Sequence, residues 1–273
     1  MFDDSQPTRR ALLGGAATAT SVGLAGCSSV LGGGTSATPT RTSDSAEAAA
    51  STPDGGTATG ADTTPGDAAQ FRATAQFRAT TGTAHGVDLA WAPVVGAADA
   101  DVSIHYWSDY QCPFCEQFES ETYPTLLENE VADGTARLVL LQFPNIGKSS
   151  AGAALLAKGV WHQVRAERPD RFGAWHSHIF ENQEKPNSGW AEYGELLELT
   201  REVDGVDAAA ADEYVRGNQD ELTDVVKAEQ RAGEEAGISG TPGFMLYGGS
   251  DSTKLLGAQP YTRFENAIAD LSR

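Results

Sequence analysis

The chain has 273 residues, of which 38 are acidic and 19 are basic, so its formal net charge at pH 7 is −19. Such an acidic surface repels nucleic acids and anionic membrane surfaces, which excludes both as expected partners. Because only five of the basic residues are lysines, the composition is typical of a protein that works in concentrated salt, as in haloarchaea. An ordinary solvated acidic surface is the alternative.

The first 26 residues are predicted to be an export signal. The segment Thr8-Arg9-Arg10-Ala11-Leu12-Leu13 resembles a twin-arginine signal, and the mildly apolar run that follows is too short to span a bilayer. The segment Leu24-Ala25-Gly26-Cys27 resembles a lipobox, in which cleavage before the cysteine leaves a lipid on Cys27. A generic secretory peptide with a chance cysteine is the alternative. We therefore expect an extracytoplasmic protein, anchored to the outer face of the cell membrane by the lipid at Cys27.

Residues 27–80 are predicted to be a disordered linker, because they consist mainly of Ser, Thr, Gly and Ala. The linker ends in a duplicated hexapeptide, in which Ala69–Thr74 is repeated as Ala75–Thr80. Two copies are too few for a repeat fold. The globular domain is predicted to occupy residues 81–273.

The first half of this domain reads as strand, helix and strand. Val102–Trp107 alternates and is rich in β-forming residues, which predicts a strand. A helix is predicted from Cys112 to about Val131, with a kink at Pro124. The unbroken apolar run Leu138–Leu141 is typical of a strand buried on both faces, as in a parallel sheet.

The second half is predicted to hold several helices and then two strands. Apolar residues recur at helical spacing within residues 147–237, strands are expected at Phe244–Tyr247 and Lys254–Leu256, and a last helix is expected at Tyr261–Leu271. This order predicts an α/β protein, namely a thioredoxin fold with an inserted helical subdomain at about 147–237. The helices expected inside the insertion are 153–164, 172–182, 191–204, 208–215 and 221–236.

Cys112-Pro113-Phe114-Cys115 is the motif that carries chemistry. Two thiols at i and i+3 at the start of a helix can close a disulfide reversibly, and the backbone N–H groups of the first turn stabilise a thiolate there. Pro113 suits the first turn because its missing N–H leaves no helical hydrogen bond unmade. Cys112 is therefore the expected exposed nucleophile, and Cys115 the more buried resolving thiol.

A CxxC motif also occurs in zinc sites, but two further ligands would be needed. His176 and His178 are the obvious candidates, yet residues two apart on a helix point in nearly opposite directions. We therefore expect no metal site there, and we expect both histidines to pack or to lie at the surface.

The second motif is Gly240-Thr241-Pro242, directly before the strand at Phe244, where a proline fits a tight turn at the start of the strand. Together with Asp109–Cys115, Phe180–Gln183 and Gly237–Pro242, it resembles the matching segments of DsbA-like thiol–disulfide oxidoreductases over roughly residues 90–273.

The resemblance implies a nucleophilic Cys112, a resolving Cys115 and a cis peptide at Thr241-Pro242 that packs against them. It also makes Thr241 a candidate for pairing with the substrate chain. Asp109 is a candidate proton acceptor, and the alternative is that it is an exposed carboxylate in a turn. Phe114 stands where the best-known oxidases have histidine. Losing an imidazolium neighbour predicts a less oxidising couple.

The predicted function is that of an extracytoplasmic thiol–disulfide oxidoreductase, with the Cys112–Cys115 disulfide as its redox group and no cofactor. Its expected partners are exported proteins with cysteine pairs and an unidentified redox partner. A reductase or isomerase of the same fold is one alternative. A lipid-anchored module that binds a soft metal such as copper, or another solute, is the other.

Overall fold

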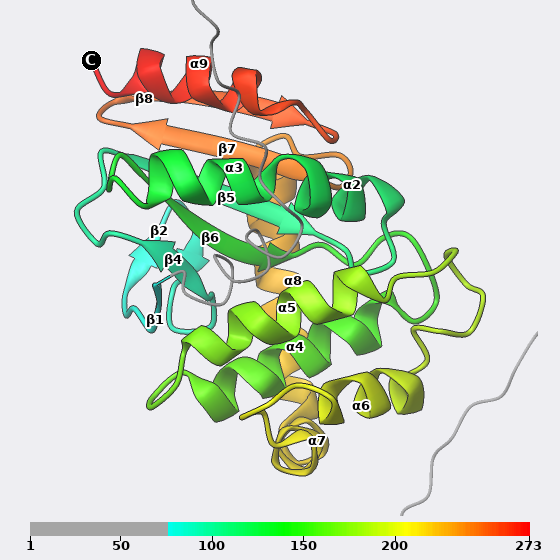
Figure 1. Ribbon diagram of the computed structural model, residues 1–273. Helices are drawn as coiled ribbons and strands as arrows, with labels where there is room; N and C mark the ends of the chain where they lie inside the picture. Colours follow the sequence, from blue (N-terminus) through cyan, green and yellow to red (C-terminus); the bar gives the residue numbers. More distant parts are fainter. Residues whose placement is uncertain (1–75) are drawn as a thin grey trace, which may run out of the picture. The chain divides into compact units, whose positions relative to one another are not determined.

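The computed structural model describes residues 76–273 (Figure 1). The predicted export signal, the lipid site at Cys27 and most of the predicted linker lie outside these residues. No helix within 76–273 is long and apolar enough to cross a membrane.

A six-stranded sheet forms the centre of the domain, in the order β1-β4-β6-β5-β7-β8. Strands β5 and β6 run parallel, with Ile104 opposite Leu138, and all other neighbours are antiparallel. The strands are β1 (Phe77–Arg78), β4 (Val94–Gly96), β5 (Val102–Ser108), β6 (Ala136–Gln142), β7 (Gly243–Gly248) and β8 (Asp251–Leu256). A separate hairpin is formed by β2 (Thr83–Ala84) and β3 (Val87–Asp88).

Helices cover both faces of this sheet (Figure 1). One face carries the helices next to the CPFC motif and the last helix, whereas α8 lies on the other face, where Ala232 packs with Trp107 and Met245. The helices are α2 (Pro113–Glu121), α3 (Tyr123–Leu126), the π-helix η1 (Leu127–Val131), α4 (Ser150–Val164), α5 (Asp170–Glu181), α6 (Tyr193–Arg201), α7 (Ala208–Gly217), α8 (Gln219–Glu235) and α9 (Tyr261–Leu271).

The predicted fold class is confirmed, because β5-α2-β6 and β7-β8-α9 are separated by the helical segment α4 to α8. The helix predicted to run from Cys112 to Val131 is interrupted at Thr122, two residues before Pro124, and continues as α3 and η1. The central strand β5 is buried along its whole length, as expected for a strand with helices on both sides.

The predicted start of the domain at residue 81 is too late. Phe77, in the second copy of the hexapeptide, lies in edge strand β1 and is buried. Its ring packs against Phe172 and fills the space where a Cβ at Gly173 would be, so helix α5 accepts the phenylalanine only because it carries glycine there. Composition alone could not place the start of the domain here, because the contact joins residues almost 100 positions apart in the chain.

Candidate functional site

The CPFC motif lies at the start of α2, directly after the loop that follows β5. Cys112 is the N-cap residue of the helix, and Pro113 occupies the first helical position, as predicted. The Cys112 carbonyl oxygen accepts hydrogen bonds from the backbone N–H groups of Cys115 and Glu116, at 3.0 and 3.2 Å. Both thiols are free in this structure.

The Thr241–Pro242 turn lies against the first of these thiols. The peptide bond between the two residues is cis, as the resemblance implies, and the Cys112 thiol donates a hydrogen bond to the Thr241 carbonyl oxygen at 3.1 Å. Two segments more than 120 residues apart in the chain therefore meet at one sulfur.

The burial of Cys112 differs from the sequence prediction. Cys112 is only 1% exposed, so it is not the exposed thiol that was expected, whereas Cys115 is 0% exposed and is buried as expected. The reason is a contact with a distant segment of the chain, because the Thr241 turn lies against Cys112. Phe114, by contrast, is 61% exposed, so the motif presents a phenylalanine ring to solvent above a covered pair of thiols.

The two thiols have opposite acidities. Hydrogen bonding by Cys115 is the main cause that lowers the pKa of Cys112 from 9.0 to about 6; the Thr241 side chain and the amides of Cys115 and Phe114 add to it, and burial opposes it. Burial raises the pKa of Cys115 well above its ordinary value, and the hydrogen bond and charge of Cys112 raise it further. At neutral pH, Cys112 is therefore the thiolate and Cys115 its proton-bearing partner.

Asp109 is buried, and its carboxylate accepts hydrogen bonds from three backbone N–H groups. Its Oδ1 accepts the N–H of Gln111, and its Oδ2 accepts the N–H groups of Asn145 and Ile146, each at 2.8 Å. It thus ties the loop before α2 to the loop after β6. This geometry favours a positioning role for Asp109 over the predicted role as proton acceptor. The alternative prediction, an exposed carboxylate in a turn, is wrong because Asp109 is only 2% exposed.

Gln183 is a site residue whose position the sequence did not predict. Its Nε2 donates to the carbonyl oxygens of Tyr110 and Cys112, at 2.6 and 3.2 Å. Asn182 does cap its own helix, by donating to the His178 carbonyl oxygen. Gln183 follows α5, so the helical segment between the two halves of the fold holds the loop that carries Cys112.

The two histidines considered as zinc ligands have separate surroundings. His176 is buried, with Nδ1 2.8 Å from the Tyr110 hydroxyl and Nε2 3.0 Å from a carboxylate oxygen of Glu119. His178 instead pairs with Glu202 at 3.1 Å near the surface. Within residues 76–273, no group of three or more histidine, cysteine or acidic side chains is arranged to hold a metal ion.

With this geometry in view, comparison with known proteins identifies the family. A family model described as thioredoxin matches residues 91–270. The chain belongs to this family.

Curated relatives add a likeness to disulfide bond formation proteins. Disulfide bond formation protein D of Bacillus subtilis is 27% identical over 150 residues, which are 55% of this chain and 65% of that protein. A probable disulfide bond formation protein D of Bacillus cereus is 29% identical over 108 residues, which are 40% of this chain and 48% of that protein. The chain therefore spans less than two thirds of the first relative and about half of the second.

Solved structures show the same architecture. Oxidised BdbD of Bacillus subtilis has a TM-score of 0.57 at 24% identity, covering 71% of this chain and 98% of its own. A thioredoxin-like oxidoreductase of Silicibacter pomeroyi has a TM-score of 0.54 at 25% identity, covering 66% and 91%. DsbA of Chlamydia trachomatis matches at 0.54 and 21% identity, over 65% and 88%. The comparisons support the DsbA-like resemblance.

Proposed function

We propose that this protein is an extracytoplasmic thiol–disulfide oxidoreductase that forms or exchanges disulfides in exported proteins. The observation that carries the proposal is the asymmetric thiol pair. Cys112 has a pKa lowered to about 6, and Cys115, directly beside it, has a raised one. A metal site gives no reason for such a difference, nor for the Thr241–Pro242 turn against Cys112.

The proposed reaction consists of two exchange steps. A client thiolate attacks Sγ of Cys112 in the oxidised protein, so a client–Cys112 disulfide forms, the Cys112–Cys115 bond breaks, and Cys115 leaves as a thiolate that takes up a proton. The second client thiolate then attacks the client sulfur of the mixed disulfide and releases Cys112 as a thiolate. The client loses two electrons, and the protein gains them.

The low pKa of Cys112 suits this sequence, because a thiol of low pKa is the better leaving group in the second step. The protein ends in the dithiol form, which a separate electron acceptor must reoxidise. We propose that an unidentified redox partner does so.

A polypeptide substrate is supported by the surface around the thiols. Phe114 is 61% exposed and Ile146, which lies in the loop after β6, is 36% exposed. Large apolar side chains exposed beside a reactive sulfur favour contact with apolar segments of an unfolded client. The resemblance assigns backbone pairing with the client to Thr241, whose carbonyl oxygen already meets Cys112.

Export and anchoring are further parts of the proposal, supported by the sequence alone. The twin-arginine-like segment would send the folded protein out of the cytoplasm, and lipid on Cys27 would hold it at the outer face of the membrane. The linker from residue 27 would let one anchored domain reach many clients.

Trapping of mixed disulfides tests the activity. A Cys115→Ala variant keeps the Cys112 thiolate, which can attack a disulfide of a client, so that a client–Cys112 disulfide forms and the other client cysteine leaves as a thiolate. Because Cys115 is missing and cannot attack this mixed disulfide, client proteins joined to Cys112 should accumulate in cells. These adducts should disappear on reduction and should be absent from a Cys112→Ser variant. Cells that make the Cys115→Ala protein at normal levels without such adducts would contradict the proposal.

A further inference from the structure

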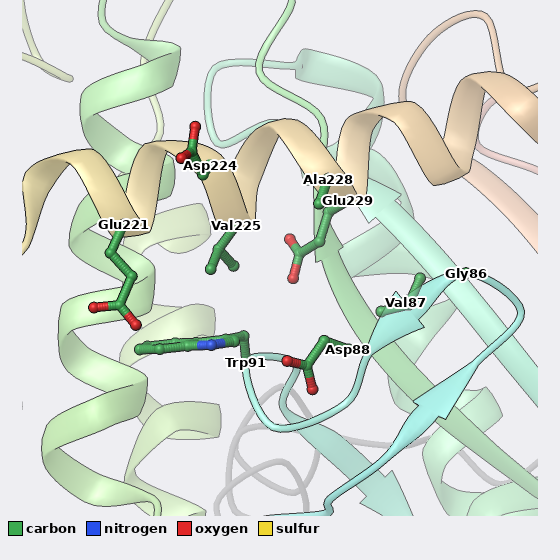
Figure 2. A pocket seen from close by; sticks show the side chains of 9 residues that line it. All are labelled: Gly86, Val87, Asp88, Trp91, Glu221, Asp224, Val225, Ala228 and Glu229. Carbon is green, nitrogen blue, oxygen red and sulfur yellow. The ribbon is translucent and has the colours of Figure 1, made fainter.

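A cavity of about 470 Å³ lies away from the cysteine pair, between α8 and the β2–β3 hairpin (Figure 2). The hairpin reaches α8 through a two-residue turn, His85-Gly86, in which both φ angles are positive, 48° and 82°. The residues that line the cavity are Gly86, Val87, Asp88, Trp91, Glu221, Asp224, Val225, Ala228 and Glu229.

The cavity is an apolar slot with a flat aromatic wall. Figure 2 shows the Trp91 ring lying flat opposite α8, with Val225 pointing toward it across the gap. Trp91 already forms one cation–π contact, because the Arg165 guanidinium lies 5.0 Å from its ring centroid. Arg165 is not among the residues that line the cavity. An indole of this kind favours a second positive or alkyl group on the side that is open to the slot.

A carboxylate stands at each end of this slot. In Figure 2, Glu221 points to one end of the Trp91 ring and Asp88 to the other. Neither forms an ion pair with another residue of the segment 76–273, and the one hydrogen bond that the Asp88 carboxylate accepts comes from the Ala90 N–H, at 3.0 Å.

The Glu229 carboxylate, at the Asp88 end of the slot, already forms an ion pair with Lys158. Its Oε1 lies 2.5 Å from Lys158 Nζ, and its Oε2 accepts the Gln142 N–H at 2.8 Å. Burial raises the pKa of Glu229, and the charge of Asp88 adds to this effect. The repulsion between the two carboxylates would be relieved by a cation bound beside Asp88.

We propose that this slot binds a linear aliphatic diamine, with its alkyl chain between Trp91 and Val225 and one ammonium group at each carboxylate. Charge complementarity fixes the two ends, and the apolar walls fix the middle. Glu221 and Glu229 lie eight residues apart on α8, which corresponds to about 12 Å along the helix axis. An alkyl chain of a few methylenes is long enough to bridge the two ends.

Calorimetric titration of the intact protein with the series from 1,3-propanediamine to 1,8-octanediamine tests this site. The titrations are made in the salt concentration at which the protein is folded. Affinity should pass through an optimum in chain length, and pentylamine, with one charge, should bind at least tenfold more weakly than the best diamine. Equal affinity for pentylamine, absence of a length optimum or absence of binding would overturn the proposal.

Three single variants locate the ligand. Glu221→Gln and Asp88→Asn should each weaken the best diamine at least tenfold and should remove its advantage over pentylamine. Glu235→Gln is the matched control, because Glu235 lies on the same helix, is exposed and loses the same charge, but does not line the cavity. Its affinity should stay within twofold of the wild type. A loss as large as that of Glu221→Gln would show attraction to a generally acidic surface and overturn the site.

Discussion

At the scale of single residues, the chemistry of the site depends on Cys112 being deprotonated while Cys115 keeps its proton. The thiolate of Cys112 is stabilised by short-range hydrogen bonds, first of all from the Cys115 thiol. Such bonds are direct contacts, so salt screens them far less than it screens the field of a helix dipole. The acidity of Cys112 should therefore persist in concentrated salt.

Alkylation of the reduced protein by iodoacetamide measures this acidity. Because only the thiolate reacts, the rate at Cys112 should rise as pH increases through about 6 and level off above it. The midpoint should move little between low and molar salt. In a Cys112→Ser variant, the buried Cys115 should react slowly at neutral pH. A midpoint near 9, the ordinary value of a thiol, would contradict the geometry described for Cys112.

At the scale of secondary-structure elements, edge strand β1 was not predicted, because it lies in a segment whose composition is typical of a linker. Strand β1 has only two residues, yet Phe77 is 7% exposed and packs with Phe172 of α5. Truncating a buried phenylalanine removes apolar contacts and leaves a cavity.

Phe77→Ala should therefore lower the free energy of unfolding by about 3 kcal/mol, at the lower end of the usual range because Phe77 lies in an edge strand. Urea denaturation of the reduced protein measures this loss. Phe71→Ala is the matched control, because Phe71 holds the same place in the first copy of the hexapeptide, inside the predicted linker. Equal losses for both variants would contradict the assignment of the packed strand to the second copy.

The elements that local pattern determines were predicted well. The strand at Val102, the helix at Cys112 and its break near Pro124 each follow from a periodicity or from a proline. The site residue Gln183 was missed as a partner of Cys112, because its contact depends on how α5 docks beside α2. The burial of Cys112 was missed for the same reason, since the turn that lies against it comes from a distant segment.

At the scale of the whole molecule, one buried ion pair joins the helical segment to the sheet. Lys158 of α4 and Glu229 of α8 are 1% and 3% exposed and lie 2.5 Å apart. Lys158 also donates to the Trp91 carbonyl oxygen, and Glu229 accepts the N–H of Gln142 at the end of β6. The pair therefore links α4, α8, β6 and the segment after the hairpin.

Lys158→Met should lower the free energy of unfolding by about 3–5 kcal/mol, because it leaves the Glu229 carboxylate buried without its cation. Chemical denaturation provides the measurement. The double variant Lys158→Met with Glu229→Leu should lose less, because no charge remains buried. Lys148→Met is the surface control: its partner Glu192 lies 3.8 Å away and both side chains are exposed, so the cost should be under about 1 kcal/mol. A Lys158→Met loss no larger than this control would contradict the linking role of the pair.

The reduction potential of the Cys112–Cys115 couple decides whether this pair is a catalytic redox site or a structural disulfide. Equilibration with glutathione buffers, read out by the fraction of free thiol, should give a single two-electron transition that is absent from Cys112→Ser and Cys115→Ala proteins. Because the Cys112 pKa of about 6 lies between the values of about 7 for thioredoxin and about 3.5 for DsbA, the potential should lie between about −270 and about −120 mV. A potential below about −300 mV, as in a structural disulfide, or no disulfide at all, would contradict the assignment of this pair as a catalytic redox site.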